Sequence, residues 1–248
     1  EQKFSIFGQC DVGMRCMINS DCIEFDQTKG IAILTDGLEQ SEAGKISAKL
    51  AAKSVFEGLR SDTFTNDLPS SNEEQVLNAI DKLLSKTNQV LIDASKSVGE
   101  ENYMRTTIVA ILIRKRKIFL GHVGDSRVYL LRNNILEKLT RDHSLVQDLV
   151  FRGVYHQRKQ KSSSIDSVTR VLGAKPNIEI TTLAHEIKSG DRLLLCSDGL
   201  SDMLSDKEIE EIANTEIHNL KKTTQNLIKF ANRRGGRDNI SVILAQIP

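Results

Sequence analysis

Residues 191–200 read DRLLLCSDGL. Three leucines and a cysteine form an apolar run that predicts a buried strand. The run ends at Asp198-Gly199, where a turn is expected. A similar stretch at residues 31–38, IAILTDGL, ends in Asp36-Gly37. Both stretches therefore place a carboxylate at the end of a buried strand.

Two more segments place an aspartate beside a strand-like run: Asp125 in GHVGDSRVYLL and Asp238 in GGRDNISVIL. A buried carboxylate is costly unless it is paired or bound to a metal. Any single junction could be an ordinary turn or helix cap, and Arg127 or Arg237 could pair with its neighbouring aspartate. Asp36 and Asp198 have no adjacent base, however, and the four junctions together favour a shared hard cation.

The composition fits one large domain spanning residues 1–248. A chain of 248 residues with 39% hydrophobic content can bury one substantial core. Its 34 Lys and Arg residues nearly balance its 33 Asp and Glu residues, which argues against nucleic acid as a partner. No apolar run approaches the ~20 residues that span a bilayer, and the first residues lack the layout of a secretory signal.

The four cysteines are Cys10, Cys16, Cys22 and Cys196, and they include no Cys-x-x-Cys pair. The close ligand pairs of zinc or thioredoxin-like sites are therefore missing, although the first three could form a ligand set with Cys196 or His143. No cysteine precedes the glycine-rich loop that a cysteine phosphatase needs. This cysteine usage fits a reduced, cytoplasmic compartment.

Hydrophobic periodicity predicts an α+β layered domain with mostly antiparallel sheets. Residues 152–167 are polar and irregular, and we expect them to form a surface loop. Strands are predicted at 4–13, 22–25, 31–35, 106–113, 117–123, 127–131, 136–139, 178–183, 191–196 and 240–247, and helices at 41–58, 72–98, 143–151, 206–214 and 219–233.

Taken together, these segments resemble the metal-dependent Ser/Thr protein phosphatases of the 2C type, in their compact bacterial form. The resemblance rests on four motifs that occur in the family's order: GDSR at 124–127, TRDHS at 140–144, LLLCSDGL at 193–200 and GGRDNIS at 235–241. It implies a four-layer αββα sandwich, in which two antiparallel sheets are flanked by helix pairs. It also implies a binuclear Mn²⁺ or Mg²⁺ site at one edge and a flap at about 152–167.

By position, the resemblance assigns metal ligands to this sequence. Asp36 would bridge the two metals, the Gly37 carbonyl would bind one of them, and Asp198 and Asp238 would hold the other. Oxygen-only ligands suit Mg²⁺ or Mn²⁺ rather than zinc. Two such ions about 3.5–4 Å apart lower the pKa of a bridging water, which can then attack a phosphate monoester in line.

The resemblance assigns two further carboxylates and exposes one departure. Asp21 would orient a metal-bound water, and Asp125 would help to form a labile third metal site. Cys16 stands where bacterial relatives carry an arginine that clamps the substrate phosphate, and Arg15 stands one residue earlier. If this segment is a strand, that single step turns Arg15 to the opposite face, so Arg15 reaches the phosphate only through a local bulge.

Two more departures affect the surroundings of the site. Ser20 replaces an acidic or amide residue, which affects one water contact. Glu39-Gln40 replaces a glycine pair, so that the loop could shield the second metal or simply face solvent.

The sequence therefore predicts a monomeric enzyme that hydrolyses phosphoserine and phosphothreonine on proteins with metal-activated water. Its partners would be a phosphorylated protein and a cognate Ser/Thr kinase of bacterial type, with no nucleic acid or membrane. One alternative is a regulatory module on the same fold that binds phosphoproteins with weak or no activity. Another is hydrolysis of a small phosphorylated metabolite. Intact Asp36, Asp198 and Asp238 favour an active enzyme.

Overall fold

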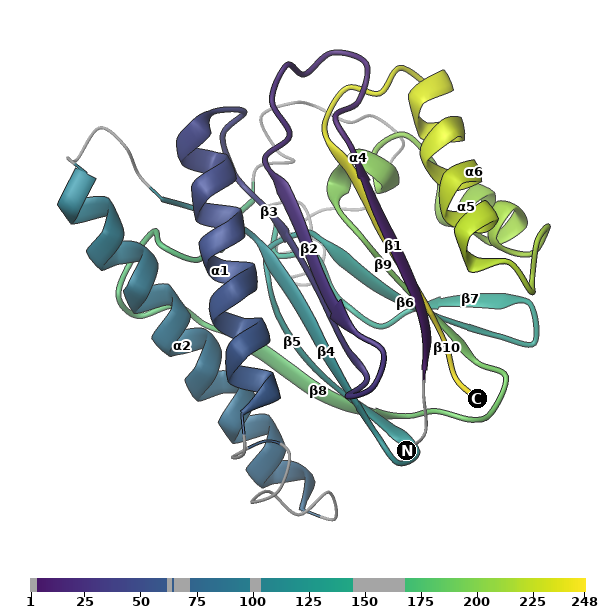
Figure 1. Cartoon of the computed structure of the whole chain (residues 1–248), viewed down its shortest axis with the longest axis horizontal. Helices are drawn as coiled ribbons and strands as arrows, with labels where there is room; N and C mark the ends of the chain where they lie inside the picture. Colours follow the sequence, from purple (N-terminus) through teal and green to yellow (C-terminus); the bar gives the residue numbers. More distant parts are fainter. Residues whose placement is uncertain (1–3, 62–63, 65–71, 99–103, 145–167) are drawn as a thin grey trace, which may run out of the picture.

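The computed structural model describes residues 4–61, 64, 72–98, 104–144 and 168–248, and it places two β-sheets face to face between helices (Figure 1). Neighbouring strands pair antiparallel throughout both sheets. The first sheet has the order β1 (Ser5–Asp11), β10 (Ile240–Gln246), β9 (Arg192–Cys196), β6 (Arg127–Arg132) and β7 (Ile135–Lys138). The second has the order β2 (Asp21–Asp26), β3 (Ile31–Asp36), β4 (Ile108–Arg114), β5 (Lys117–Val123) and β8 (Thr181–Glu186).

Helices cover the outer face of each sheet, which completes the four layers (Figure 1). The second sheet is covered by α1 (Glu42–Arg60) and α2 (Glu73–Val98). The first sheet is covered by α4 (Asp198–Ser201), α5 (Asp206–Ala213) and α6 (Leu220–Arg233). The predicted α+β fold, a sandwich of αββα type, is confirmed.

Three apolar cores hold the layers together. The central strands contribute side chains to two of these cores at once, because successive residues of a strand point to opposite faces of the sheet. In β4, Ile108, Ala110 and Leu112 pack toward α1 and α2, whereas the alternating residues Val109 and Ile111 pack between the sheets. Because side chains alternate along a strand, an unbroken apolar run is buried on both faces. The run in β9 behaves in the same way: its residues alternate between the core shared by the sheets and the core beneath α4–α6.

Local signals set where the helices begin. Ser41 caps α1 by accepting a hydrogen bond from the Gly44 N–H at 3.2 Å. Ser205 and Glu208 form a capping box at the start of α5. Each cap satisfies N–H groups that have no partner within the helix, which explains why these helices begin close to their predicted starts.

Three predicted elements differ from the structure. The strand predicted at 178–183 is instead β8 at Thr181–Glu186, because residues 178–180 belong to no strand, although Ile178 and Ile180 pack on the core. The strand predicted to reach Gly13 ends at Asp11. The helix predicted at 143–151 does not include His143 and Ser144, and its other residues lie outside the described part of the chain. The predicted flap at 152–167 also lies outside it.

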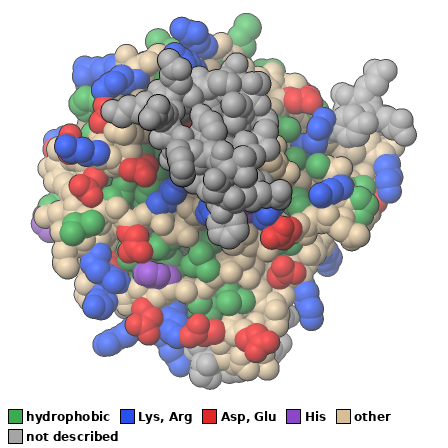
Figure 2. Space-filling model, turned by 180° about the vertical axis from the view of Figure 1, so that it is seen from behind, with side chains coloured by type: hydrophobic (Ala, Val, Ile, Leu, Met, Phe, Trp, Pro, Cys, Tyr) green, Lys and Arg blue, Asp and Glu red, His purple; other side chains and the backbone are tan. Residues whose placement is uncertain are grey.

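The surface carries both signs of charge. Seen from the side opposite to Figure 1, acidic and basic side chains are interspersed (Figure 2). Of the helices that the structure describes, none combines the length and the apolar character needed to cross a membrane.

Candidate metal centre

The predicted metal ligands lie at one edge of the sandwich because four strands begin or end there. β3 ends at Asp36, and β9 ends at Cys196, two residues before Asp198. Asp238 precedes β10, which runs antiparallel to β9 and so begins at the same edge. Asp21 begins β2 and lies directly opposite Asp36 in the antiparallel ladder. This edge is the one that carries α4 in Figure 1.

The carboxylates at this edge act strongly on one another. Burial, followed by the charges of Asp21, Asp198, Asp125 and Asp238, raises the pKa of Asp36 well above its usual value. Burial, with Asp125 and Asp238 next, does the same to the pKa of Asp198. Like charges within a few ångströms disfavour ionisation of each group, and a cation bound among them would offset that repulsion.

Asp21 and Asp125 show the same effect to a lesser degree. Burial raises the pKa of Asp21 to about 6, while the nearby hydroxyls of Ser241 and Ser197 oppose the rise. Burial, followed by the charge of Asp142, raises the pKa of Asp125 to about 7. All five predicted carboxylates therefore belong to one electrostatic cluster.

Unpartnered oxygens mark where a cation fits. The Oδ1 atoms of Asp21 and Asp198 are buried and have no hydrogen-bond partner. Within the described residues, no group of three or more His, Cys, Asp or Glu side chains forms a ready-made metal-binding set. Mg²⁺ and Mn²⁺ keep several waters and take few carboxylates, so a spread of aspartates with free oxygens fits them better than a closed cage.

The backbone of Asp36 and Gly37 is fixed by the next strand. Thr106 Oγ1 and the Thr107 N–H both donate to the Asp36 carbonyl at 2.8 Å. These bonds hold the Asp36 backbone and do not use its carboxylate. A Cβ on Gly37 would lie 2.3 Å from the Gly44 carbonyl oxygen, so only glycine lets α1 begin this close to the site. Thr106 and Thr107 thus position the predicted ligand Asp36 without being ligands themselves.

Ser197 supports the carboxylate cluster, a role that was not predicted. Its Oγ donates to Asp21 Oδ2 at 2.9 Å and accepts from the Ser241 N–H at 3.0 Å. Ser197 precedes α4 but makes no side-chain cap there, because its hydroxyl is used by Asp21. A serine before the first residue of a helix would normally signal only a cap, which explains why the role could not be predicted.

Asn239 ties the loop at 12–20 to the metal edge. Its Nδ2 donates to the carbonyls of Val12 and Ile18, both at 2.9 Å, and its Oδ1 accepts from the Ser20 N–H at 2.7 Å. Its neighbour Asp238 is therefore held against this loop. The asparagine in GGRDNIS is thus a structural clamp, a role visible only once 12–20 and 239 lie side by side.

The sequence profile of the family described as protein phosphatase 2C matches residues 17–245 of this chain. The chain belongs to the protein phosphatase 2C family. The predicted family is therefore confirmed, and the match includes every carboxylate of the cluster.

Individual relatives agree with this phosphatase assignment. The serine/threonine phosphatase stp of Listeria monocytogenes serotype 4b is 31% identical over 229 residues, covering 92% of this chain and 88% of the relative. The structure of the Streptococcus agalactiae serine/threonine phosphatase matches with a TM-score of 0.86 at 30% identity, covering 99% of this chain and 100% of the other. The chain is accordingly a Ser/Thr protein phosphatase, and the regulatory-module alternative is not favoured.

A further relative bears on the cofactor. The catalytic domain of the serine/threonine protein phosphatase PstP, solved with two manganese ions, matches with a TM-score of 0.82 at 28% identity and 99% coverage of both chains. The prediction of a Mn²⁺- or Mg²⁺-dependent phosphatase is confirmed at the level of the family.

In this phosphatase, two residues that depart from the family pattern, Gln40 and Cys16, lie close to Asp238. Gln40 Nε2 lies 3.0 Å from Asp238 Oδ1, and Cys16 Sγ lies 3.8 Å from the same oxygen. Glu39 turns outward toward Arg105, with 3.8 Å between their charged atoms. The loop at Glu39-Gln40 could have shielded a metal or faced solvent. In the structure Gln40 contacts the predicted ligand Asp238, whereas Glu39 faces solvent near Arg105.

Arg15 and Cys16 lie in a loop and not in a strand. Residues 12–20 form turns and loop, so the alternation of side chains along a strand does not apply to Arg15 and Cys16. Arg15 is exposed. Its contact with substrate phosphate stays a prediction.

Arg127 and His143 stabilise the neighbourhood of Asp125 without neutralising it. Arg127 donates to both oxygens of Asp142, at 3.0 Å from Nε and 2.7 Å from Nη2. The idea that Arg127 pairs with its neighbour Asp125 is therefore wrong, and Asp125 stays available. His143 Nδ1 accepts from the Gly124 N–H at 3.1 Å, which braces the turn before Asp125.

Proposed function

We propose that this phosphatase holds two Mn²⁺ or Mg²⁺ ions through Asp36, the Gly37 carbonyl, Asp198 and Asp238. The observation that supports this most directly is the convergence of these aspartates, which raise the pKa of Asp36 and Asp198, together with the buried, unpartnered Oδ1 atoms of Asp21 and Asp198. Asp125 raises the pKa of both Asp36 and Asp198, which supports a third, more labile ion beside it. When bound, the ions supply Lewis acidity that lowers the pKa of water and neutralises charge on phosphoryl oxygens.

The remaining chemistry falls to the chain's own residues. Asp21 is fixed by Ser197 through Oδ2, so its free Oδ1 can accept a hydrogen bond from a water and orient it for in-line attack. We infer that Arg15, on the loop next to Cys16, would contact the phosphate of an incoming phosphoserine. Because the other predicted site residues are acidic, a cation from this loop would offset their repulsion of a dianionic phosphate.

The family and the sequence also support a proposal about the domain, oligomeric state, location and partners of this phosphatase. We infer that residues 1–248 form one catalytic domain that acts as a monomer in the cytoplasm. Its substrates would be phosphoproteins, and a cognate Ser/Thr kinase would supply them. The likeness to serine/threonine phosphatases over 92% of the chain supports the substrate class.

The test of this function is metal-dependent turnover. We expect Mn²⁺ to support hydrolysis of an aryl phosphate and a phosphoserine peptide, EDTA to abolish both, and Mn²⁺ in excess to restore them. We also expect Mn²⁺ to raise the Tm of the EDTA-treated protein, since binding to the native state stabilises it by mass action. Phosphorylated metabolites assayed in parallel test the alternative that the enzyme hydrolyses a small phosphorylated metabolite. Turnover that persists in EDTA, with no shift in Tm, would contradict the metal centre.

Replacing Cys16 by arginine should strengthen substrate binding. Cys16 Sγ lies 3.6 Å from the Arg237 carbonyl and 3.8 Å from Asp238, so a longer cationic side chain at this position starts at the edge of the centre. A charge-assisted contact with phosphate is worth roughly 1.5–3 kcal/mol, and we expect KM for the aryl phosphate to fall about tenfold or more.

The matched control for this change is Arg15→Ala. If Arg15 already binds the phosphate, Arg15→Ala should raise KM without changing the apparent affinity for Mn²⁺. If Cys16→Arg leaves KM unchanged while Arg15→Ala raises it, the clamp lies at Arg15 and not at position 16.

A further inference from the structure

The two carboxylate oxygens of Asp238 have different surroundings. Oδ1 accepts hydrogen bonds from the Asn239 N–H at 2.7 Å and from Gln40 Nε2 at 3.0 Å. Cys16 Sγ lies 3.8 Å from the same oxygen. Among the residues that the structure describes, none donates to Oδ2 or pairs with it. Oδ1 is therefore held by the chain, and Oδ2 is the oxygen that is left for an ion.

The loop between β3 and α1 holds Gln40 in place. The Glu39 carbonyl accepts from the Ser41 N–H at 2.8 Å and from Ser20 Oγ at 2.9 Å. Ser41 also caps α1, so the residues on both sides of Gln40 are fixed by hydrogen bonds. The Gln40 side chain thus extends from a constrained backbone and contacts Asp238, which is 198 residues away in the chain.

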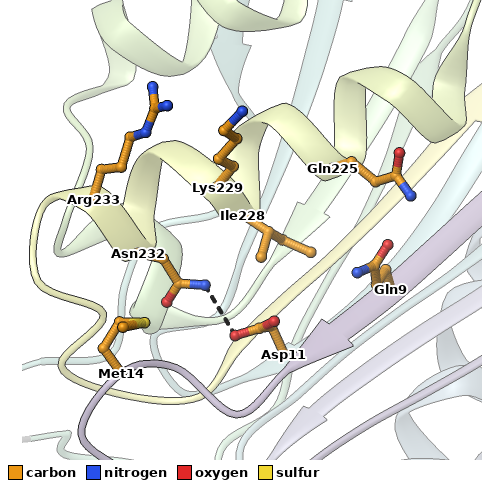
Figure 3. Close-up of a pocket in the computed structure, with 8 residues that line it drawn as sticks. All are labelled: Gln9, Asp11, Met14, Gln225, Ile228, Lys229, Asn232 and Arg233. Atoms are coloured by element: carbon orange, nitrogen blue, oxygen red, sulfur yellow. Dashed lines mark hydrogen bonds between the residues drawn. The ribbon is translucent and has the colours of Figure 1, made fainter.

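The loop between β1 and β2 carries Cys16 and is anchored at its start. Asn232 Nδ2 donates to Asp11 Oδ1 at 3.0 Å, and Figure 3 shows these two side chains facing each other. Three residues further along the chain, the Met14 N–H donates to the Gly236 carbonyl at 2.8 Å. The loop is therefore tied to the segment between α6 and β10, which keeps Cys16 beside the carboxylate.

The groups around Oδ1 are a backbone N–H, an amide and a thiol. Because a carboxylate only accepts hydrogen bonds, the Gln40 amide turns its NH₂ group toward Oδ1. A donor on one oxygen restricts rotation of the carboxylate, so the other oxygen is oriented before an ion arrives. Partners that hold a ligand without binding the ion typically change metal affinity by about 10–100-fold. The contacts around Oδ1 are therefore suited to position Asp238 as a ligand.

We propose that Gln40 is a positioning residue for the metal ion at Asp238. Its amide holds Oδ1 and leaves Oδ2 to bind the ion, so Gln40 sets the affinity for that ion. The inference rests on the proposed metal centre and goes beyond it, because Gln40 is not itself a ligand. A glycine, which the family pattern places here, has no side chain to make this bond. The bond is therefore a property of this chain.

The experiment compares Gln40→Met with a matched control. Methionine is similar to glutamine in length and volume but donates no hydrogen bond. The control is Gln89→Met on α2, where Gln89 Nε2 donates to Asp93 Oδ1 at 2.8 Å in an exposed position. Both substitutions break a bond between a glutamine and an aspartate, but only Gln40 lies at the proposed centre. Mn²⁺ is titrated into each protein after EDTA treatment and dialysis, and free Mn²⁺ is followed by electron paramagnetic resonance, which does not depend on turnover.

We expect one of the bound Mn²⁺ ions to bind about tenfold more weakly in Gln40→Met. The Mn²⁺ concentration for half-maximal hydrolysis of a phosphoserine peptide should rise by a similar factor. The kcat at saturating Mn²⁺ and the KM for the peptide should stay close to wild type. The Tm in EDTA should change little, because an exposed hydrogen bond adds little to folding stability. Gln89→Met should match wild type in every measurement.

Three results would overturn the proposal. Unchanged Mn²⁺ binding in Gln40→Met would show that the amide does not position Asp238. Tighter binding would show that Gln40 competes with the ion for the carboxylate. Weaker binding together with a clearly lower Tm in EDTA would assign a structural role to the bond. Failure of the metal centre itself looks different, since wild type would then bind no Mn²⁺ and show no metal-dependent turnover.

Discussion

Replacing Asp198 by asparagine should lower Mn²⁺-supported hydrolysis of a phosphoserine peptide by roughly a thousandfold or more. Charge stabilisation by a bound ion is worth several kcal/mol in the transition state, and each 1.4 kcal/mol is a factor of ten. Asp198 begins α4, just beyond the end of β9, and has a buried, unpartnered oxygen, so its loss would remove a ligand that no neighbour replaces. Asp36→Asn should have the same effect, because Asp36 is the predicted bridge.

The same substitution should stabilise the metal-free protein, which separates a lost ligand from a misfolded chain. Burial and the charges of Asp125 and Asp238 raise the pKa of Asp198 in the folded state. When folding raises the pKa of a carboxyl, that group does not destabilise the folded state at a pH below its unfolded pKa. The folded state loses stability as the pH rises from there through the folded pKa. Asparagine carries no such cost, so at neutral pH we expect a higher Tm in EDTA.

The measurements are kcat/KM with Mn²⁺ and thermal unfolding with and without Mn²⁺. Asp93→Asn is a suitable control, since the Asp93 side chain is 61% exposed on α2 and far along the chain from every predicted ligand. Near-wild-type turnover in both Asp198→Asn and Asp36→Asn would refute the assignment of these two ligands. A lower Tm in EDTA would instead indicate that the aspartates are structural.

Replacing Gly199 by alanine should destabilise the protein by at least about 3 kcal/mol and abolish activity. A Cβ on Gly199 would lie 1.9 Å from the Asn239 carbonyl oxygen and 2.8 Å from its carbonyl carbon. Both are backbone atoms, which cannot move aside as a flexible side chain can, and overpacking of this kind is among the costliest point changes. In a domain of this size the loss corresponds to a fall in Tm of roughly 6–12 °C.

The effect on activity has a separate cause. Gly199 is next to Asp198, and Asn239 is next to Asp238, so one added methyl group pushes two predicted ligands apart. Gly190→Ala is the control: its φ of +89° makes alanine unfavourable by about 1–2 kcal/mol, but no atom lies within 4 Å of the added Cβ. We expect Gly190→Ala to lose some Tm and keep its kcat. A Gly199→Ala protein with wild-type Tm and turnover would show that this contact does not constrain the site.

Much of the fold could be predicted because its signals are local. The apolar runs at β3, β4 and β9 are buried on both faces, and an unbroken run of this kind requires covering layers on either side. Caps at Ser41 and Ser205 fixed the helix starts within a residue. The strand predicted at 178–183 was misplaced because apolar residues there pack on the core without pairing, and hydrophobicity alone does not distinguish these two cases.

Short motifs in the chain were sufficient to predict the layered α+β fold and the family, and to nominate the site aspartates. The groups that surround these aspartates depend on the tertiary packing. Arg127 binds Asp142 rather than its neighbour Asp125, and Gln40 and Cys16 lie against Asp238 from positions roughly two hundred residues away in the chain. Likewise, the end of β1 meets α6 through Asp11 and Asn232, which are 221 residues apart in the chain. Contacts between distant segments depend on the complete packing of both sheets, and no local pattern records them.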